Sequence, residues 1–73
     1  MTLTHKVITK KQFNGMVDQL EGAGAWKELS QNNNGETIVT LNTPKGKELF
    51  RAIVSFDGEI HARWVDGLFN VRD

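Results

Sequence analysis

Few side chains in this chain could carry out acid–base or metal chemistry. The sequence has two histidines, no cysteine and no tyrosine. Glu59 and His61 are two residues apart in a strand-like run, so both would point to the same side and could share a metal ion, but a third ligand is missing. A catalytic site would also need a nucleophile with a base in reach, and His5 lies near the chain terminus. The sequence therefore predicts no enzyme, no catalytic residue, no metal site and no cofactor.

Cations are the remaining candidates for binding chemistry. Arg51 and Arg63 lie in two strand-like runs on either side of Asp57-Gly58. Lys45 and Lys47 lie in a turn-like segment. Lys10 and Lys11 lie at the start of a helix-like segment, where free backbone N–H groups favour an anion. The cations that could contact an anion or a nucleic acid are Lys10, Lys11, Lys45, Lys47, Arg51 and Arg63. Nine basic residues balance nine acidic ones, so the chain lacks the long-range field of a typical nucleic-acid-binding domain.

Length and composition limit the class of protein. A chain of 73 residues has room for one small domain, residues 1–73, which would bury only about 60% of the surface of its unfolded chain. Without cysteine no disulfide can reinforce the fold, so association with a second copy is one way to add stability. No apolar run approaches the roughly 20 residues of a membrane span, and no secretory signal is visible at the N-terminus. We therefore expect a cytoplasmic protein that does not bind membranes.

A helix is predicted to begin after Thr9. Thr9 and Gln12 have the spacing of a capping box, and Ile8 and Phe13 have the spacing of a hydrophobic staple. Apolar residues recur at helical spacing as far as Leu20, and a glycine at position 22 or 24 ends the helix.

The segment 25–31 allows two interpretations. Trp26 and Leu29 could continue the helix, or residues 26–30 could form an edge strand. The Asn34-Gly35 turn pair and the β-branched run 36–42 favour the strand. Further strands begin at Glu48 and Glu59, and residues 68–71 either add a short strand or fold back over the core. We therefore predict an α+β fold in which one N-terminal helix packs on a three- to four-stranded antiparallel β-meander.

The turn at Asp57-Gly58 decides which side chains share a face of the sheet. A two-residue turn would mix large apolar and charged side chains on both faces. A three-residue loop over 56–58, with Gly58 in the left-handed region, pairs Phe50 with Trp64 and makes one face uniformly apolar, so we predict this register. The predicted core contains Phe13, Met16, Val17, Leu20, Val39, Leu41, Phe50, Ala52, Val54, Ile60, Ala62 and Trp64.

The opposite face of the sheet is predicted to be a mixed surface. A four-residue loop over 44–47 would pair Asn42 with Leu49 on this face. Arg51 would stand directly opposite Arg63, which is unfavourable unless an anion or a carboxylate such as that of Glu48 lies between them. Apolar residues around arginines are typical of an interface, although β-branched residues also occur on strands without a partner. The predicted partner-binding residues are Ile38, Thr40, Leu49, Arg51, Ile53, His61, Arg63 and Val65.

These patterns lead to two hypotheses about function. The first is a non-enzymatic regulatory or interaction module that binds a protein partner, or a second copy of itself, through the open sheet face or a sheet edge. The alternative is a weak nucleic-acid-binding domain that uses the two arginines with Lys45 and Lys47. Sheet-type binders of single strands display aromatic rings, whereas both tryptophans are expected in the core here. In size, neutrality and order of elements the chain is similar to small regulatory or inhibitory proteins of phages and mobile elements, although no motif carries this resemblance.

Overall fold

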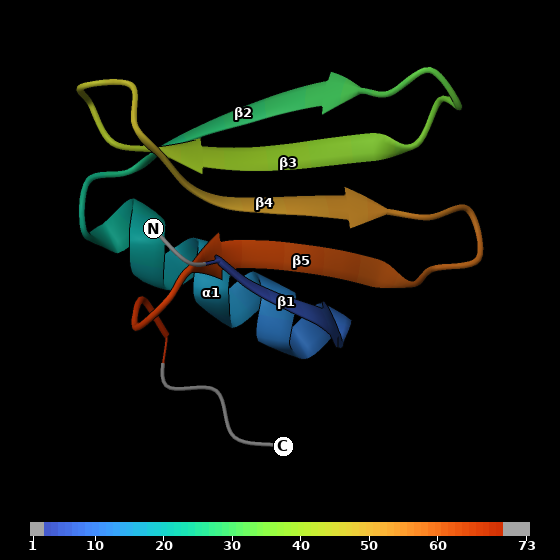
Figure 1. Ribbon diagram of the computed structural model, residues 1–73, viewed down its shortest axis with the longest axis horizontal. Helices are drawn as coiled ribbons and strands as arrows, with labels where there is room; N and C mark the ends of the chain where they lie inside the picture. Colours follow the sequence, from blue (N-terminus) through green and yellow to red (C-terminus); the bar gives the residue numbers. More distant parts are fainter. Residues whose placement is uncertain (1–2, 70–73) are drawn as a thin grey trace.

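A five-stranded antiparallel sheet and a helix on one of its faces form the computed structural model, which describes residues 3–69 (Figure 1). The elements are β1 (Leu3–Ile8), α1 (Lys10–Gly22), β2 (Trp26–Gln31), β3 (Thr37–Asn42), β4 (Glu48–Val54) and β5 (Ile60–Val65). The strand order is β1-β5-β4-β3-β2, so β1 and β2 are the two edges. The α+β class agrees with the prediction, whereas three to four strands is too few.

β1 is the strand that the sequence prediction missed. It pairs with β5, which is the last strand in the chain, and it precedes the helix, so the helix is not the first element. The pairing places His5 opposite Arg63 instead of near a free terminus. The apolar residues of β1 do not alternate strictly with polar ones, and its partner is distant in sequence, so no local pattern identifies it.

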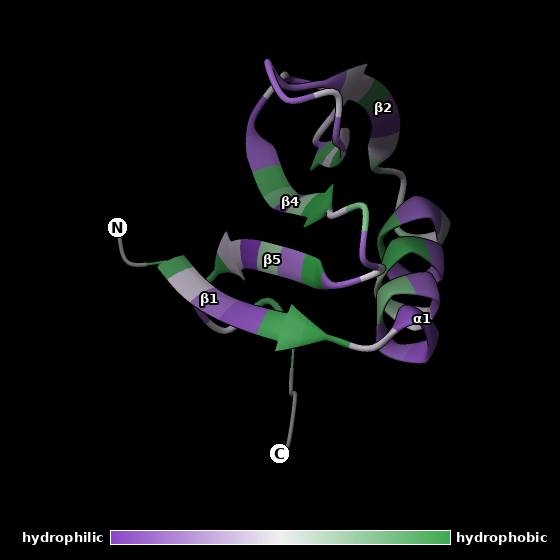
Figure 2. Ribbon diagram, turned by 90° about the vertical axis from the view of Figure 1, so that its right-hand side faces the viewer, coloured by the Kyte–Doolittle hydropathy of each residue, from purple (hydrophilic) through white to green (hydrophobic). Residues whose placement is uncertain are grey.

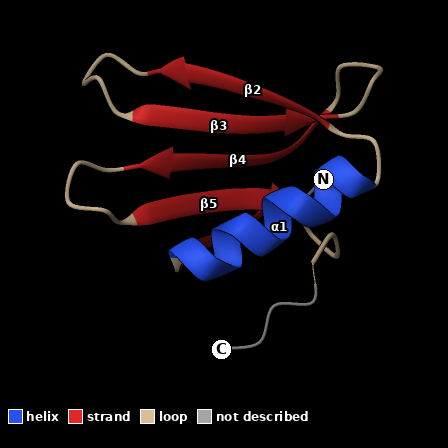
Figure 3. Ribbon diagram, turned by 180° about the vertical axis from the view of Figure 1, so that it is seen from behind, coloured by secondary structure: helices blue, strands red, loops and turns tan. Residues whose placement is uncertain are grey.

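The capping box at the start of α1 is present. The Thr9 hydroxyl accepts from the Gln12 backbone N–H at 3.1 Å, and the Gln12 side chain accepts from the Thr9 backbone N–H at 3.0 Å. The buried residues of α1 are Met16, Val17 and Leu20, which join the core cluster with side chains from the sheet. In Figure 3, α1 runs across one face of the sheet, and after Gly24 the chain returns to the sheet as β2.

The predicted register of β4 and β5 is confirmed. Phe50 lies opposite Trp64, and the Ser55 N–H donates to the Glu59 carbonyl at 2.8 Å across the three-residue loop 56–58. Gly58 has a φ of 91°, as this loop requires. The predicted core residues are buried, except for Phe13 and Val54, which are half-buried against the core. Ile8 is a further core residue that the prediction lacked.

The loop between β3 and β4 corrects one detail of the prediction. It has three residues, 44–46, because the Thr43 N–H donates to the Lys47 carbonyl at 2.8 Å and Gly46 has a φ of 91°. The register then shifts between Leu41 and Asn42, so that Asn42 pairs with Glu48. Leu49 is therefore an extra residue in a bulge, and its expected pairing with Asn42 is wrong.

The segment after β5 folds back over the core. Leu68 and Phe69 are half-buried, and the Phe69 ring stands edge-on to Trp64 with ring centroids 5.6 Å apart. Residues 70 and 71, the rest of the expected segment, lie outside the described residues. Within residues 3–69, no helix has the length and the apolar run that crossing a membrane requires.

Candidate functional site

The face of the sheet turned away from α1 is the candidate functional surface. Figure 2 views the sheet from the side, with α1 against one face and no other described element against the other. On β5, the more exposed His61, Arg63 and Val65 alternate with buried residues that pack toward the helix. We call this surface the open face. By register it carries Leu3, His5, Val7, Trp26, Glu28, Ser30, Ile38, Thr40, Asn42, Glu48, Arg51, Ile53, His61, Arg63 and Val65.

Three charged side chains meet at the centre of the open face. Arg51 lies directly opposite Arg63, and Glu48 joins both guanidinium groups. The distances are 2.7 Å from Arg51 Nη2 to Glu48 Oε1 and 3.4 Å from Arg63 Nη2 to Glu48 Oε2. A carboxylate is expected between the two opposed arginines, and Glu48 provides it. Because one carboxylate serves two guanidinium groups, the cluster keeps a net positive charge.

The two arginines are only partly solvated. Their side chains are 39% and 36% exposed, and the Nε atoms of both are shielded from solvent without a hydrogen-bond partner in the described part of the chain. A shielded, unpaired N–H group costs free energy, since it has given up water without a replacement. The contacts with Glu48 orient both guanidinium groups.

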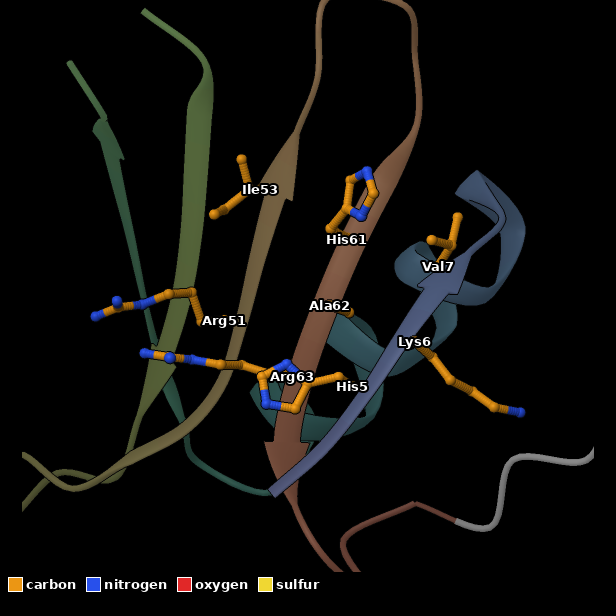
Figure 4. Close-up of a pocket in the computed structure, with 8 residues that line it drawn as sticks. All are labelled: His5, Lys6, Val7, Arg51, Ile53, His61, Ala62 and Arg63. Atoms are coloured by element: carbon orange, nitrogen blue, oxygen red, sulfur yellow. The ribbon is translucent and has the colours of Figure 1, made fainter. Parts of the chain in front are cut away.

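A hollow of about 390 Å³ opens beside this cluster. Its lining comes from β1, β4 and β5, and includes Val7, Ile53 and His61 in addition to the two arginines. Figure 4 shows the Arg51 and Arg63 side chains running side by side in one direction, with the His5 ring next to Arg63. Ile53, His61 and Val7 form a second row beyond them. The hollow thus offers cationic donors and aliphatic walls to the same ligand.

The margins of the open face expose large apolar side chains. Trp26 is 66% exposed at the β2 edge, and Val7 is 55% exposed at the β1 edge. The expectation that both tryptophans are buried is therefore wrong for Trp26, which lies opposite Asn42. An edge strand has a neighbour on one side only, so a side chain there is covered less than the same side chain in a central strand.

The predicted partner-binding residues lie on the open face, with one exception. Leu49 packs against the core and lines a small hollow with Leu20 and Ala25, because the bulge turns it toward the helix. The prediction also missed the contribution of β1, which adds His5 and Val7. Only the long-range pairing of β1 with β5 reveals these two residues, so no local signal could have found them.

The predicted set of cations does not form one surface. Lys10 and Lys11 are exposed at the start of α1, on the side of the sheet opposite the arginines, while Lys45 and Lys47 are exposed in the β3–β4 loop. His61 Nε2 lies 3.3 Å from Glu59 Oε2. Within residues 3–69, no group of three or more histidine or acidic side chains could hold a metal ion.

The open face is thus a rigid surface with a charged centre, aliphatic surroundings and apolar edges. Its chemistry suits binding, since the groups on it are guanidinium, imidazole and aliphatic side chains in fixed positions. In comparisons with known proteins, no family model, no curated protein and no solved structure matches this chain.

Proposed function

We propose that this chain is a non-enzymatic binding module that docks a protein partner on the open face, over Arg51, Ile53, His61 and Arg63. The observation that supports this proposal most directly is the sharing of one carboxylate by two half-buried arginines. Glu48 accepts one hydrogen bond from Arg63 and pairs with Arg51, so donors on both guanidinium groups remain for a second carboxylate. An aspartate or glutamate side chain of the partner would complete this arrangement.

Docking would strengthen the charge interactions of the cluster. A partner that excludes water from the hollow lowers the local dielectric, and charge-assisted hydrogen bonds then contribute more than they do in water. Arginines with fixed planar donors are also enriched among the residues that dominate interface energetics. The ion pairs with Glu48 already orient both guanidinium groups, which lowers the side-chain entropy lost on binding.

The aliphatic residues around the cluster supply the apolar part of such an interface. Val7 and Ile53 line the hollow, and Ile38 lies opposite Ile53 on β3. The molecule measures 29 × 29 × 24 Å, so the open face is wide enough for the roughly 800 Å² that each partner buries in a standard interface. A module of this kind would regulate its partner by covering the partner's own surface.

Affinity capture with matched charge variants tests this proposal. The chain is immobilised as wild type, as Arg51→Glu and as Lys45→Glu, and retained proteins are compared by quantitative mass spectrometry. Both variants make the same change of charge, but only the first alters the open face. We expect at least one protein to be retained by wild type and Lys45→Glu and to be reduced about tenfold or more on Arg51→Glu. Equal retention of every protein by Arg51→Glu would contradict the proposal.

A second candidate, a single-stranded nucleic acid, is favoured by the exposure of Trp26. An exposed ring near cations is the arrangement on which bases stack, and Trp26 lies on the same face as Arg51. Titration with a mixed-sequence oligonucleotide separates the two candidates. Binding that weakens steeply with salt and is lost in Trp26→Ala would favour the nucleic acid. No binding at low salt would leave the protein partner as the proposal.

A further inference from the structure

β2 is an exposed edge of the sheet. All six of its residues are exposed, and among the described strands it pairs with β3 alone. Trp26 is 66% exposed on the open face, and Leu29 is 67% exposed on the face that α1 occupies. β2 contains no proline and its pairing with β3 has no bulge, so two of the devices that keep an edge from pairing with another strand are missing. Its charged residues are Lys27 and Glu28, and Lys27 Nζ lies 4.0 Å from Glu21 Oε1 of α1.

The β2–β3 turn shows which backbone groups of β2 are free to pair. The Asn32 N–H donates to the Glu36 carbonyl at 3.1 Å, so Asn32 directs its backbone toward β3. Backbone groups alternate in direction along a strand, and Ser30, Glu28 and Trp26 therefore also face β3. The N–H and C=O groups of Lys27, Leu29 and Gln31 face outward from the sheet edge.

We propose that two copies of this chain pair through β2, antiparallel and about a two-fold axis, in the register that places Leu29 opposite Leu29 of the second copy. Lys27 then lies opposite Gln31, and Glu28 lies opposite Ser30. The outward-facing backbone groups of Lys27, Leu29 and Gln31 are all used, and three pairs that each exchange two bonds give about six backbone hydrogen bonds. The result is one continuous sheet with both helices on the same side.

The number of hydrogen bonds favours this register over both of its neighbours, and charge favours it further over one of them. A two-fold axis perpendicular to the sheet pairs only residues that lie on the same face. The residue numbers of a pair therefore add up to an even number, and neighbouring registers differ by two in this sum. Moving one step in one direction places Glu28 opposite Glu28 of the second copy, and moving one step in the other direction places Ser30 opposite Ser30; either move reduces the hydrogen bonds to about four. Like charges directly opposite each other are unfavourable, whereas the Leu29 register sets each charged residue against a neutral one.

A groove beside β2 supplies the apolar contact for this register. It has a volume of about 410 Å³ and lies between α1 and the edge of the sheet. Its apolar lining comes from Phe13, Val17, Leu29 and Val39, and its polar lining from Asn14, Asp18, Glu21 and Lys27. Leu29 of the second copy would stand about 5.5 Å away, measured between Cα atoms, on the same face of the sheet. The exposed leucine and the open side of the groove would then be covered together.

Single-cysteine cross-linking tests the register directly, because the chain has no cysteine of its own. Leu29→Cys places two thiols on the two-fold axis, at a Cα separation that a disulfide accepts. Under mild oxidation we expect Leu29→Cys to give a covalent dimer at least ten times faster than Glu28→Cys. Faster cross-linking of Glu28→Cys, or of His5→Cys on the opposite edge, would overturn the assignment.

Sedimentation equilibrium measures the association without a cross-link. A contact made mainly by one six-residue edge strand from each copy is small compared with a standard interface, so we expect wild type to dimerise in the micromolar range. Leu29→Asp should raise the dissociation constant at least tenfold, while Val7→Asp on β1 should leave it within about twofold. Circular dichroism confirms that both variants are folded. A wild-type mass that stays monomeric up to about 1 mM overturns the proposal. Arg51→Glu, the variant that tests partner docking on the open face, does not change β2. Dimerisation through β2 and docking on the open face can therefore be tested independently.

Discussion

The two faces of the β4–β5 hairpin differ sharply although they are built from adjacent residues. On the helix side, the rings of Phe50 and Trp64 stack with centroids 6.2 Å apart, and Trp64 is 3% exposed. One residue away on each strand, Arg51 and Arg63 share the carboxylate of Glu48 near solvent. Side chains alternate between faces, so stability and recognition can be assigned to different residues of the same strands. Substitutions should therefore separate the two properties.

Trp64→Ala should cause the largest loss of stability. Removing a buried indole that stacks on Phe50 and meets Phe69 edge-on costs about 3–5 kcal/mol, a large part of the stability of a small domain. Thermal unfolding followed by circular dichroism measures this loss. Trp26→Ala is the matched control, and its exposed ring should cost less than about 0.5 kcal/mol. Equal losses in the two variants would contradict the division between covered and open surfaces.

Ala52→Leu tests how tightly the helix lies on the sheet. Ala52 is fully buried opposite Ala62 and Val39, so the added carbon atoms have no space and should cost about 1–3 kcal/mol. Ile53→Leu, one residue away on the open face, keeps the volume and should be nearly neutral. Urea unfolding of both variants gives the comparison, and a neutral Ala52→Leu would show that the helix side tolerates extra volume.

Glu48→Gln should have an intermediate effect on stability. It removes the carboxylate between two opposed guanidinium groups, and we expect a loss of about 0.5–1 kcal/mol because all three side chains are partly solvated. The loss should shrink as salt screens the repulsion, and adding Arg51→Gln should recover part of it. An effect that does not change with salt would mean that the ion pairs contribute little.

Ile53→Ser should have the smallest effect on stability and still reduce partner binding. Ile53 lines the hollow on the open face and is only half-buried, so its loss should cost less than about 1 kcal/mol in the unfolding free energy. Capture of a partner identified with wild type should fall by about tenfold. Unchanged capture would mean that the partner does not bind at the hollow.

The central hairpins could be predicted from the sequence because their information is local. The glycine at position 58 and the need to keep Phe50 and Trp64 on one face determined the register, and the burial of the predicted core follows from it. The bulge at Leu49 was missed because the loop before it closes one residue earlier than expected. A shift of one residue moves a side chain to the other face, so Leu49 left the predicted surface.

The edges of the sheet could not be predicted in the same way. Trp26 is exposed because its register places it on the face turned away from α1, at an edge strand, and this is a property of packing in three dimensions. β1 depends on a partner strand at the other end of the chain. His5 and Val7 therefore entered the candidate surface only when the structure placed them beside Arg63 and His61.

The pairing of β1 with β5 has a consequence for the order of folding. The hairpins from β2 to β5 connect neighbours through short loops and can form rapidly, whereas β1 must close a loop that contains almost all of the described chain. The Thr4 hydroxyl, which donates to the Asp66 carboxylate, spans 62 positions in sequence. During synthesis β1 has to wait, unpaired, until residues 60–65 have left the ribosome. We therefore expect the amides of β1 to be protected from hydrogen exchange later than those of the β4–β5 hairpin.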